Sequence, residues 1–135
     1  MRSLRKIPES PIKLPRFPQG TFIKTEAGYF YVFSSTKRHR FTTLRVLESW
    51  SPQRIVKTTE NDSAVRQMKI TAKMKFRNGS LLYSQADGKM YLVSDNKLSH
   101  ITNPDWLEFL GLKRSDAVWV SKAEINLHEM GDSLD

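Results

Sequence analysis

The chain of 135 residues contains no cysteine and no long apolar run. Without cysteine it forms neither disulfide bridges nor thiolate metal sites. No apolar stretch approaches the roughly 18 residues that a membrane-spanning helix requires. The basic residues near the N-terminus are followed by Pro8, Pro11, Pro15 and Pro18 rather than by the apolar segment of a secretory signal. The sequence therefore excludes a disulfide-stabilised protein and gives no reason to expect a membrane partner.

The residue patterns of enzymes are missing as well. Neither the G-x-S-x-G pattern of serine hydrolases nor the G-x-G-x-x-G pattern of dinucleotide-binding proteins occurs. His39 and His100 have no second ligand at metal-binding spacing, and His128 lacks the second histidine of a zinc-binding helix. Paired acids occur only at Glu60 and Asp62 and in the C-terminal segment, both polar contexts. We therefore expect no catalytic activity, no cofactor, no metal site and no small-molecule substrate.

The most informative pattern that is present is a repeat with a period of about sixty residues. Turn glycines, strand hydrophobics and a helix start are repeated, whereas no pair of reactive side chains falls at matching positions. A unit of about sixty residues buries too little surface on its own, so we expect residues 17–72 and residues 73–135 to form two units that pack together. The matched positions are Phe17/Phe76, Gly20/Gly79, Gly28/Gly88, Tyr31/Tyr91, Lys37/Lys97 and Phe41/Ile101.

Each unit is predicted to form a β-hairpin, a third strand, a short helix and a fourth strand, which makes an α+β, mostly β protein. The predicted strands are residues 21–25, 29–33, 37–41 and 54–58 in unit one and 80–84, 90–93, 98–101 and 118–120 in unit two. Across the boundary of the two units, residues 68–76 alternate apolar and polar side chains, which predicts a strand with one apolar face. The helix of unit two begins at Asn103-Pro104-Asp105, and its predicted buried stripe is Trp106, Leu107, Phe109 and Leu110.

Residues 1–16 are predicted to form an extended arm. Each proline lacks an N–H donor and holds its predecessor in an extended conformation, which prevents a helix. Apolar residues are spaced among basic ones, a pattern that suits an arm whose apolar side chains lie in the grooves of a neighbour. A disordered tail is the alternative. The arm residues expected to contact a partner are Arg2, Leu4, Arg5, Ile7, Ile12, Leu14 and Arg16.

The positive charge is concentrated in the first part of the chain. Residues 1–75 hold sixteen basic and five acidic side chains, an excess of eleven positive charges, whereas residues 76–135 hold six and nine, an excess of three negative charges. This asymmetry favours an acidic partner, either nucleic acid or an acidic protein surface, and also head-to-tail contacts between copies of the chain. Solvated side chains without a partner are the alternative. The basic residues expected to make the contact are Lys37, Arg38 and Arg40.

Nucleic-acid binding is the alternative function. Sheets with exposed aromatic side chains and basic edges hold single strands by stacking and phosphate contacts. Alternation along a strand sends about half of its aromatic side chains into the core, and the basic stripe has no counterpart in unit two, where Leu98 and Ser99 replace Arg38 and His39. The predicted stripe consists of Lys37, Arg38, His39, Arg40, Arg45, Lys69, Lys73 and Lys75, near Tyr29, Phe30, Tyr31 and Phe33.

Both units share one order of motifs: a Gly-[Ser/Thr] opening, a Gly-x-x-Tyr strand, a lysine, a polar-capped short helix and a last strand. This order resembles the short tandem-repeat modules of virion-associated structural proteins of tailed bacteriophages, over residues 17–131. The resemblance implies an accessory virion protein without catalysis. Such a protein would be present in the host cytoplasm before assembly and would bind capsid, portal or tail components. The residues that carry the resemblance are Gly20, Tyr31, Lys37, Phe41, Gly79, Tyr91, Lys97, Ile101, Leu110, Gly111, Val118 and Val120.

Overall fold

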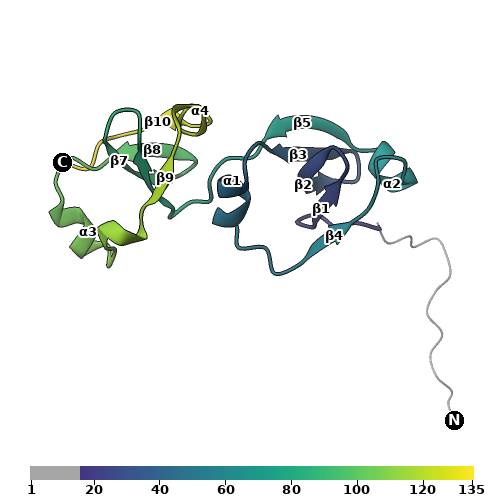
Figure 1. Cartoon of the computed structure of the whole chain (residues 1–135), viewed down its shortest axis with the longest axis horizontal. Helices are drawn as coiled ribbons and strands as arrows, with labels where there is room; N and C mark the ends of the chain where they lie inside the picture. The colour runs from purple at the N-terminus through teal and green to yellow at the C-terminus, as the bar shows by residue number, and fades with distance from the viewer. Residues whose placement is uncertain (1–15) are drawn as a thin grey trace, which may run out of the picture.

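The computed structural model describes residues 16–135, which form two five-stranded sheets side by side along the long axis of the molecule (Figure 1). Unit one contains strands β1 (Phe22–Thr25), β2 (Gly28–Ser34), β3 (Lys37–Phe41), β4 (Ile55–Lys57) and β5 (Lys69–Lys73), with helices α1 (Leu44–Ser49) and α2 (Ser63–Arg66). Unit two contains β6 (Leu81–Ser84), β7 (Met90–Ser94), β8 (Lys97–His100), β9 (Val118–Val120) and β10 (Glu129–Met130), with helices α3 (Asp105–Phe109) and α4 (Lys122–Ile125) and a 3₁₀ turn at Arg114–Asp116.

The two sheets have the same topology. The strand order is β4-β1-β2-β3-β5 in unit one and β9-β6-β7-β8-β10 in unit two. In each unit the first three strands form an antiparallel meander, the fourth strand runs parallel to the first, and the fifth runs parallel to the third. The prediction of an α+β, mostly β fold made of two packed units is confirmed. Each unit also has a second helix and a fifth strand; β5 lies within residues 68–76, for which a strand is predicted, whereas β10 is not predicted.

Backbone hydrogen bonds define which residues are equivalent. Gly20 N–H donates to Val32 O at 2.8 Å, and Gly79 N–H donates to Val93 O at 2.7 Å. A β-bulge between Val32 and Ser34 gives β2 one residue more than β7. Before the bulge, the equivalent of buried Tyr91 is therefore Phe30, and the predicted match with Tyr31 is wrong. A slip of one residue moves a side chain to the other face of a sheet.

Each sheet has an inner and an outer apolar cluster, one on each face. The repeated Phe-x-x-Gly motif places one phenylalanine in each inner cluster, where Phe17 and Phe76 are buried. The inner cluster of unit one contains Phe17, Ile23, Phe30, Val32, Val65 and Met68. The inner cluster of unit two contains Phe76, Leu82, Tyr91, Val93, Leu98, Val120 and Ile125.

The outer cluster of unit one joins the inner cluster of unit two in a single core. The residues that the outer cluster of unit one contributes to this core are Phe22, Tyr29, Tyr31, Phe41, Val46, Leu47, Trp50, Ile55 and Met74. The outer cluster of unit two is separate, lies under α3 and contains Leu81, Met90, Leu92, Ile101, Trp106, Leu107, Leu112, Ala117 and Leu134. Helix α1 lies between the two units, whereas α3 and α2 lie at opposite ends of the molecule (Figure 1).

Polar contacts close the junction around this shared core. The buried carboxylate of Glu124 in α4 accepts hydrogen bonds from Thr43 Oγ1 at 2.6 Å and Arg45 Nη1 at 2.8 Å. Thr43 also caps α1 by accepting from Val46 N–H. His128 Nδ1 lies 2.8 Å from Asn96 O, and its Nε2 accepts from Phe76 N–H at 3.1 Å. These contacts hold the start of unit two against its own core.

Two sequence predictions about burial are wrong. All five residues of β5 are exposed, so residues 68–76 do not form one strand with an apolar face; Met68, Met74 and Phe76 are buried outside the strand. β5 lies at a sheet edge, where lysines oppose unwanted strand pairing. Phe109 and Leu110, both predicted to be buried, are exposed, Phe109 to 79%. Helix α3 is too short to bury both of its faces against one sheet.

His128 gives the junction a testable pH dependence. A carbonyl only accepts, so the bond with Asn96 requires a proton on Nδ1 and leaves Nε2 free to accept from Phe76 N–H. Burial, assisted by the charge of Lys75, lowers the pKa of His128 below 6.5 despite the opposing bond to Asn96. The unfolded chain thus binds this proton more readily, and stability falls as pH drops from 6.5 towards the folded pKa.

We expect His128→Gln, which keeps one acceptor and one donor, to flatten this part of the profile. Urea unfolding of the wild type and the variant between about pH 7 and about pH 5 measures the effect. Identical slopes in the two proteins would show that His128 does not supply the pH dependence.

Candidate interaction surfaces

Strand β3 divides the predicted basic stripe between two faces of its sheet. Lys37 and His39 lie on the outer face, whereas Arg38 and Arg40 lie on the inner face beside the ring of Phe30. Successive side chains of a strand point to opposite faces, so four basic neighbours in sequence do not make one surface. Of the predicted contact residues of β3, Lys37 is therefore separated from Arg38 and Arg40.

Arg38 is part of the core, and its predicted role as a partner contact is wrong. Only 5% of the residue is exposed. Its guanidinium makes two hydrogen bonds to Glu60, at 2.6 and 2.5 Å, and lies 4.3 Å above the Phe30 ring. The equivalent residue of unit two is buried Leu98. Arg38 is an ion-paired core residue at a position where unit two has an aliphatic one.

The other predicted contact residues differ in their availability. Arg40 is half-buried and donates to Ala27 O at 2.9 Å. Lys37 is exposed, and Arg16 is exposed beside its ion-pair partner Asp62 at the start of α2. The remaining predicted contacts, Arg2, Leu4, Arg5, Ile7, Ile12 and Leu14, lie outside the described residues.

A lysine edge, defined here as Lys37, Lys69 and Lys73, follows the paired strands β3 and β5. Lys37 lies opposite Lys69 in the ladder, and all three residues are exposed. Next to them, the Phe33 and His39 rings stack with centroids 4.7 Å apart. Burial and the charge of Lys37 lower the pKa of His39, which keeps the ring neutral. Phe33, exposed at the bulge, adds an aromatic face to this basic edge.

An apolar patch covers the other end of the molecule, at α3. Phe109 packs edge-on against Trp106 at 5.3 Å, and Leu110 at the end of the helix is also exposed. Sequence reasoning missed this patch because the periodicity of a short helix does not show which of its apolar side chains finds a partner. A second exposed aromatic, Trp119 on β9, lies 5.1 Å from Tyr83.

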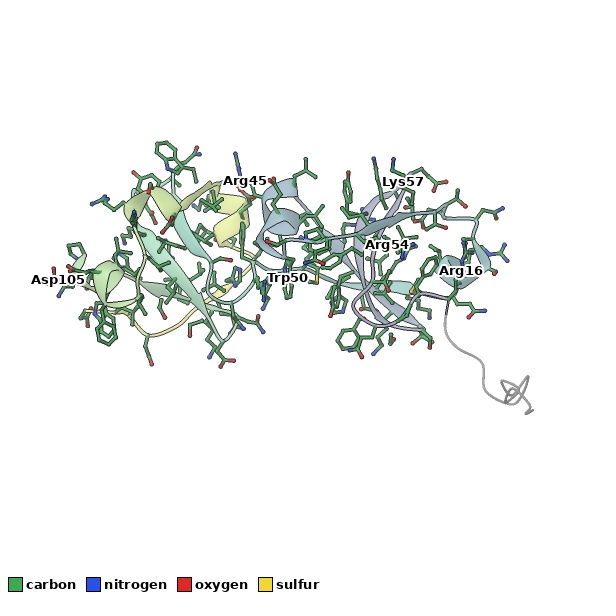
Figure 2. The ribbon with its side chains drawn as sticks, turned by 90° about the horizontal axis from the view of Figure 1, so that it is seen from below. Arg16, Arg45, Trp50, Arg54, Lys57 and Asp105 are labelled. Carbon is green, nitrogen blue, oxygen red and sulfur yellow. The ribbon has the colours of Figure 1, made fainter. Side chains whose placement is uncertain are left out.

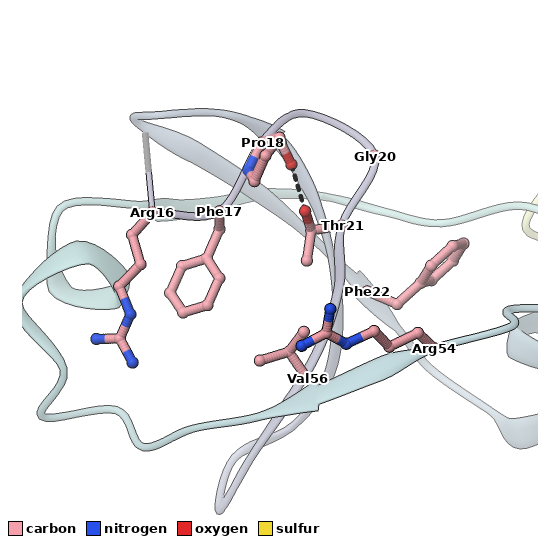
Figure 3. A pocket seen from close by; sticks show the side chains of 8 residues that line it. All are labelled: Arg16, Phe17, Pro18, Gly20, Thr21, Phe22, Arg54 and Val56. Carbon is pink, nitrogen blue, oxygen red and sulfur yellow. Dashed lines mark hydrogen bonds between the residues drawn. The ribbon is translucent and has the colours of Figure 1, made fainter. Parts of the chain in front are cut away.

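An open pocket of about 520 Å³ lies in unit one along β1 and the start of β4, between Arg16 and Arg54 (Figure 3). Thr21 donates to Pro18 O at its rim, and the pocket is lined by Arg16, Phe17, Pro18, Gly20, Thr21, Phe22, Arg54 and Val56. It thus presents apolar rings between two arginines. In residues 16–135 there is no cluster of three or more potential metal ligands, and no helix there has the length and apolar character of a membrane span.

In comparisons with known proteins, no family model, curated protein or solved structure matches this chain.

Variants of the buried ion pair test its structural role. Glu60→Gln leaves a buried guanidinium without its counter-charge, and we expect it to destabilise the fold by about 3 kcal/mol, the low end for a buried pair because Glu60 is partly exposed. Arg38→Leu introduces the residue type of unit two and leaves a carboxylate that water can reach, so we expect a smaller loss. Urea unfolding measures both changes.

The same pair predicts the acid response. Hydrogen bonds from Arg38 and then Thr25 lower the pKa of Glu60 from 4.5 to about 2, against its partial desolvation. Its contribution to stability is complete above pH 4.5 and is lost as pH falls towards 2. Arg38→Leu should weaken this acid loss. If Glu60→Gln costs no more than Arg38→Leu, the ion pair does not have the role assigned to it.

Proposed function

We propose that this chain is a non-enzymatic structural protein that joins other proteins in an assembly, as an accessory component of a tailed-phage virion. The observation that carries the proposal is the duplicated scaffold with different exposed surfaces on its two units. Both units repeat the same sheet, but only unit one exposes a lysine edge and only unit two exposes the α3 patch. Repetition of structure with divergence of surface suits a protein that connects unlike neighbours.

The lysine edge and the N-terminal arm supply the proposed contact with capsid, portal or tail proteins. Lys37, Lys69 and Lys73 are free of ion pairs among the described residues. Lys37 and Lys69 lie side by side in the ladder, and Lys73 lies farther along the same pair of strands, opposite Arg40. An acidic partner surface complements such an edge and speeds association through long-range attraction. The assignment to a virion comes from the resemblance of the repeated motifs to modules of tailed-phage structural proteins.

Deletion of the arm tests this proposal. Particles are purified from cells producing either the full chain or a chain lacking residues 1–16, and the copy number per particle is measured by quantitative mass spectrometry. We expect the full chain in the particles and at least a tenfold lower occupancy without the arm, a change that corresponds to about 1.4 kcal/mol of binding free energy.

A variant with Lys113→Glu and Lys122→Glu serves as the control, because it removes two exposed lysines from unit two and leaves the arm and the lysine edge intact. Absence of the full chain from purified particles would overturn the assignment to a virion. Equal occupancy with and without residues 1–16 would remove the arm from it.

Nucleic-acid binding is a second candidate, favoured by one observation. The stacked rings of Phe33 and His39 lie beside the lysine edge, so bases and phosphates would meet stacking and charge on the same sheet. Tyr29, Phe30 and Tyr31 are not available for this role, because Phe30 is buried and the two tyrosines pack against the shared core.

Fluorescence anisotropy with a labelled single-stranded DNA tests this candidate. At about 50 mM salt we expect binding that weakens steeply as salt is added, because each phosphate contact releases counterions. Lys37→Glu with Lys69→Glu should abolish it, and Lys113→Glu with Lys122→Glu should not. No binding of the wild type, or equal loss in both double variants, would reject this function.

A further inference from the structure

We propose that copies of this chain associate head to tail, with α3 of one copy docked on the α2 end of the next. The proposal concerns self-association and holds whether or not the chain is part of a virion. The proposal rests on the junction between the two units. There α1 of unit one packs against unit two, and the two surfaces in contact have equivalents at α3 and at the α2 end.

The internal junction shows how one unit receives the next. Trp50, at the end of α1, donates from Nε1 to Lys75 O at 2.8 Å, and Ser49 Oγ accepts from Arg77 N–H at 3.1 Å. Helix α1 thus rests on the backbone that leads into unit two, while Arg45 reaches Glu124 in α4. Arg45 and Trp50 lie between the units in Figure 2.

The surface of α3 is equivalent to that of α1. The chain turns into positive φ at Ser51 after α1 and at Gly111 after α3, and both residues donate back to a glutamate carbonyl, Glu48 or Glu108. Ser51 and Gly111 are thus equivalent and lie sixty residues apart in the sequence. The same offset makes Ser49 equivalent to Phe109 and Trp50 equivalent to Leu110. Ser49 and Trp50 are partly covered in the junction, whereas their equivalents are exposed.

The α2 end of unit one is equivalent to the surface that receives α1. Thr21 N–H donates to Pro18 O as Ser80 N–H donates to Arg77 O, so Pro18 corresponds to Arg77. Helix α2 corresponds to α4 by the same comparison, because Met68 N–H bonds to Val65 O as His128 N–H bonds to Ile125 O. Pro18, which lines the open pocket (Figure 3), therefore occupies the position of Arg77, the residue that Ser49 at the end of α1 contacts in unit two.

At one pair of equivalent positions, Ser49/Phe109 and Arg77/Pro18, the residues of the two surfaces change together. In the internal junction Arg77 N–H donates to Ser49. At the proposed contact, Pro18 has no N–H to donate and Phe109 has no hydroxyl to accept. Replacing both partners of a hydrogen bond by apolar groups leaves no unsatisfied polar atom, so the exchange is nearly neutral or favourable. The rings of Phe109 and Pro18 are exposed in the single chain and would be covered together.

Charge also favours this pairing. Asp105 and Glu108 are exposed on α3, whereas Arg66 is exposed on α2 and Arg16 is exposed beside its ion-pair partner Asp62. The acidic and basic groups lie at opposite ends of the molecule, as the positions of Asp105 and Arg16 show in Figure 2. An interface between two different surfaces of one molecule does not close on itself in a dimer, so it leads to chains or rings.

Two variants, each blocked at one end, provide the test. Phe109→Asp places a charge in the α3 patch, and Pro18→Glu places an acid opposite Asp105 and Glu108. Sedimentation velocity of the wild type should show a mass that rises with concentration above the 15.7 kDa of one chain. Each variant alone should remain at 15.7 kDa. An equimolar mixture should form a species of twice that mass and no larger one, because each variant keeps the end that the other lacks.

Trp119→Ser is the matched control, since it removes an aromatic side chain that is 62% exposed on unit two but lies outside the proposed contact. It should associate like the wild type, and thermal unfolding verifies that every variant is folded. A wild type that stays monomeric would overturn the proposal. So would unchanged association of Phe109→Asp, equal loss in Trp119→Ser, or a mixture of blocked variants that does not pair. Each of these results is independent of whether the chain enters particles.

Discussion

The structure depends on one shared apolar core at the junction of its two units. Each unit is too small to bury both faces of its sheet by itself. The facing surfaces of the two sheets are buried in a single cluster. This cluster also contains residues of helix α1 and the connecting residues Met74 and Phe76. The buried carboxylate of Glu124 is held there by hydrogen bonds from Thr43, Arg45 and Ser121. The junction thus sets the relation of the units and leaves one apolar surface uncovered at each end.

The two units show how one backbone topology tolerates different cores. The equivalent third strands place Leu98 in one inner cluster and Arg38, paired with Glu60, in the other. A bidentate pair with further hydrogen bonds offsets the desolvation of its charges, but an aliphatic residue at the same position needs no such partners. The net positive charge of unit one therefore overstates its available binding surface, because part of that charge is neutralised inside the fold.

The surfaces on which the two proposals rest are an edge and two ends of the molecule. The lysine edge runs along β3 and β5, the α3 patch covers one end, and Arg16 and α2 lie at the other (Figure 1 and Figure 2). Contacts at the ends would extend the molecule along its axis, and contacts at the edge would attach it to something else. Both proposals therefore use different parts of the same elongated molecule, and neither excludes the other.

The sequence by itself determined the duplication, the fold class and most of the strands, because turn glycines, alternating hydrophobics and helix caps act over a few residues. It did not determine which faces those residues occupy. Because of a one-residue bulge in β2, the residue equivalent to Tyr91 is Phe30 and not Tyr31. Arg38 is buried because Glu60, distant in sequence, forms an ion pair with it. Likewise Trp50 is partly covered and its equivalent Leu110 is exposed because a second unit follows α1. Burial and pairing are properties of contacts between distant segments, so only the tertiary structure decided them.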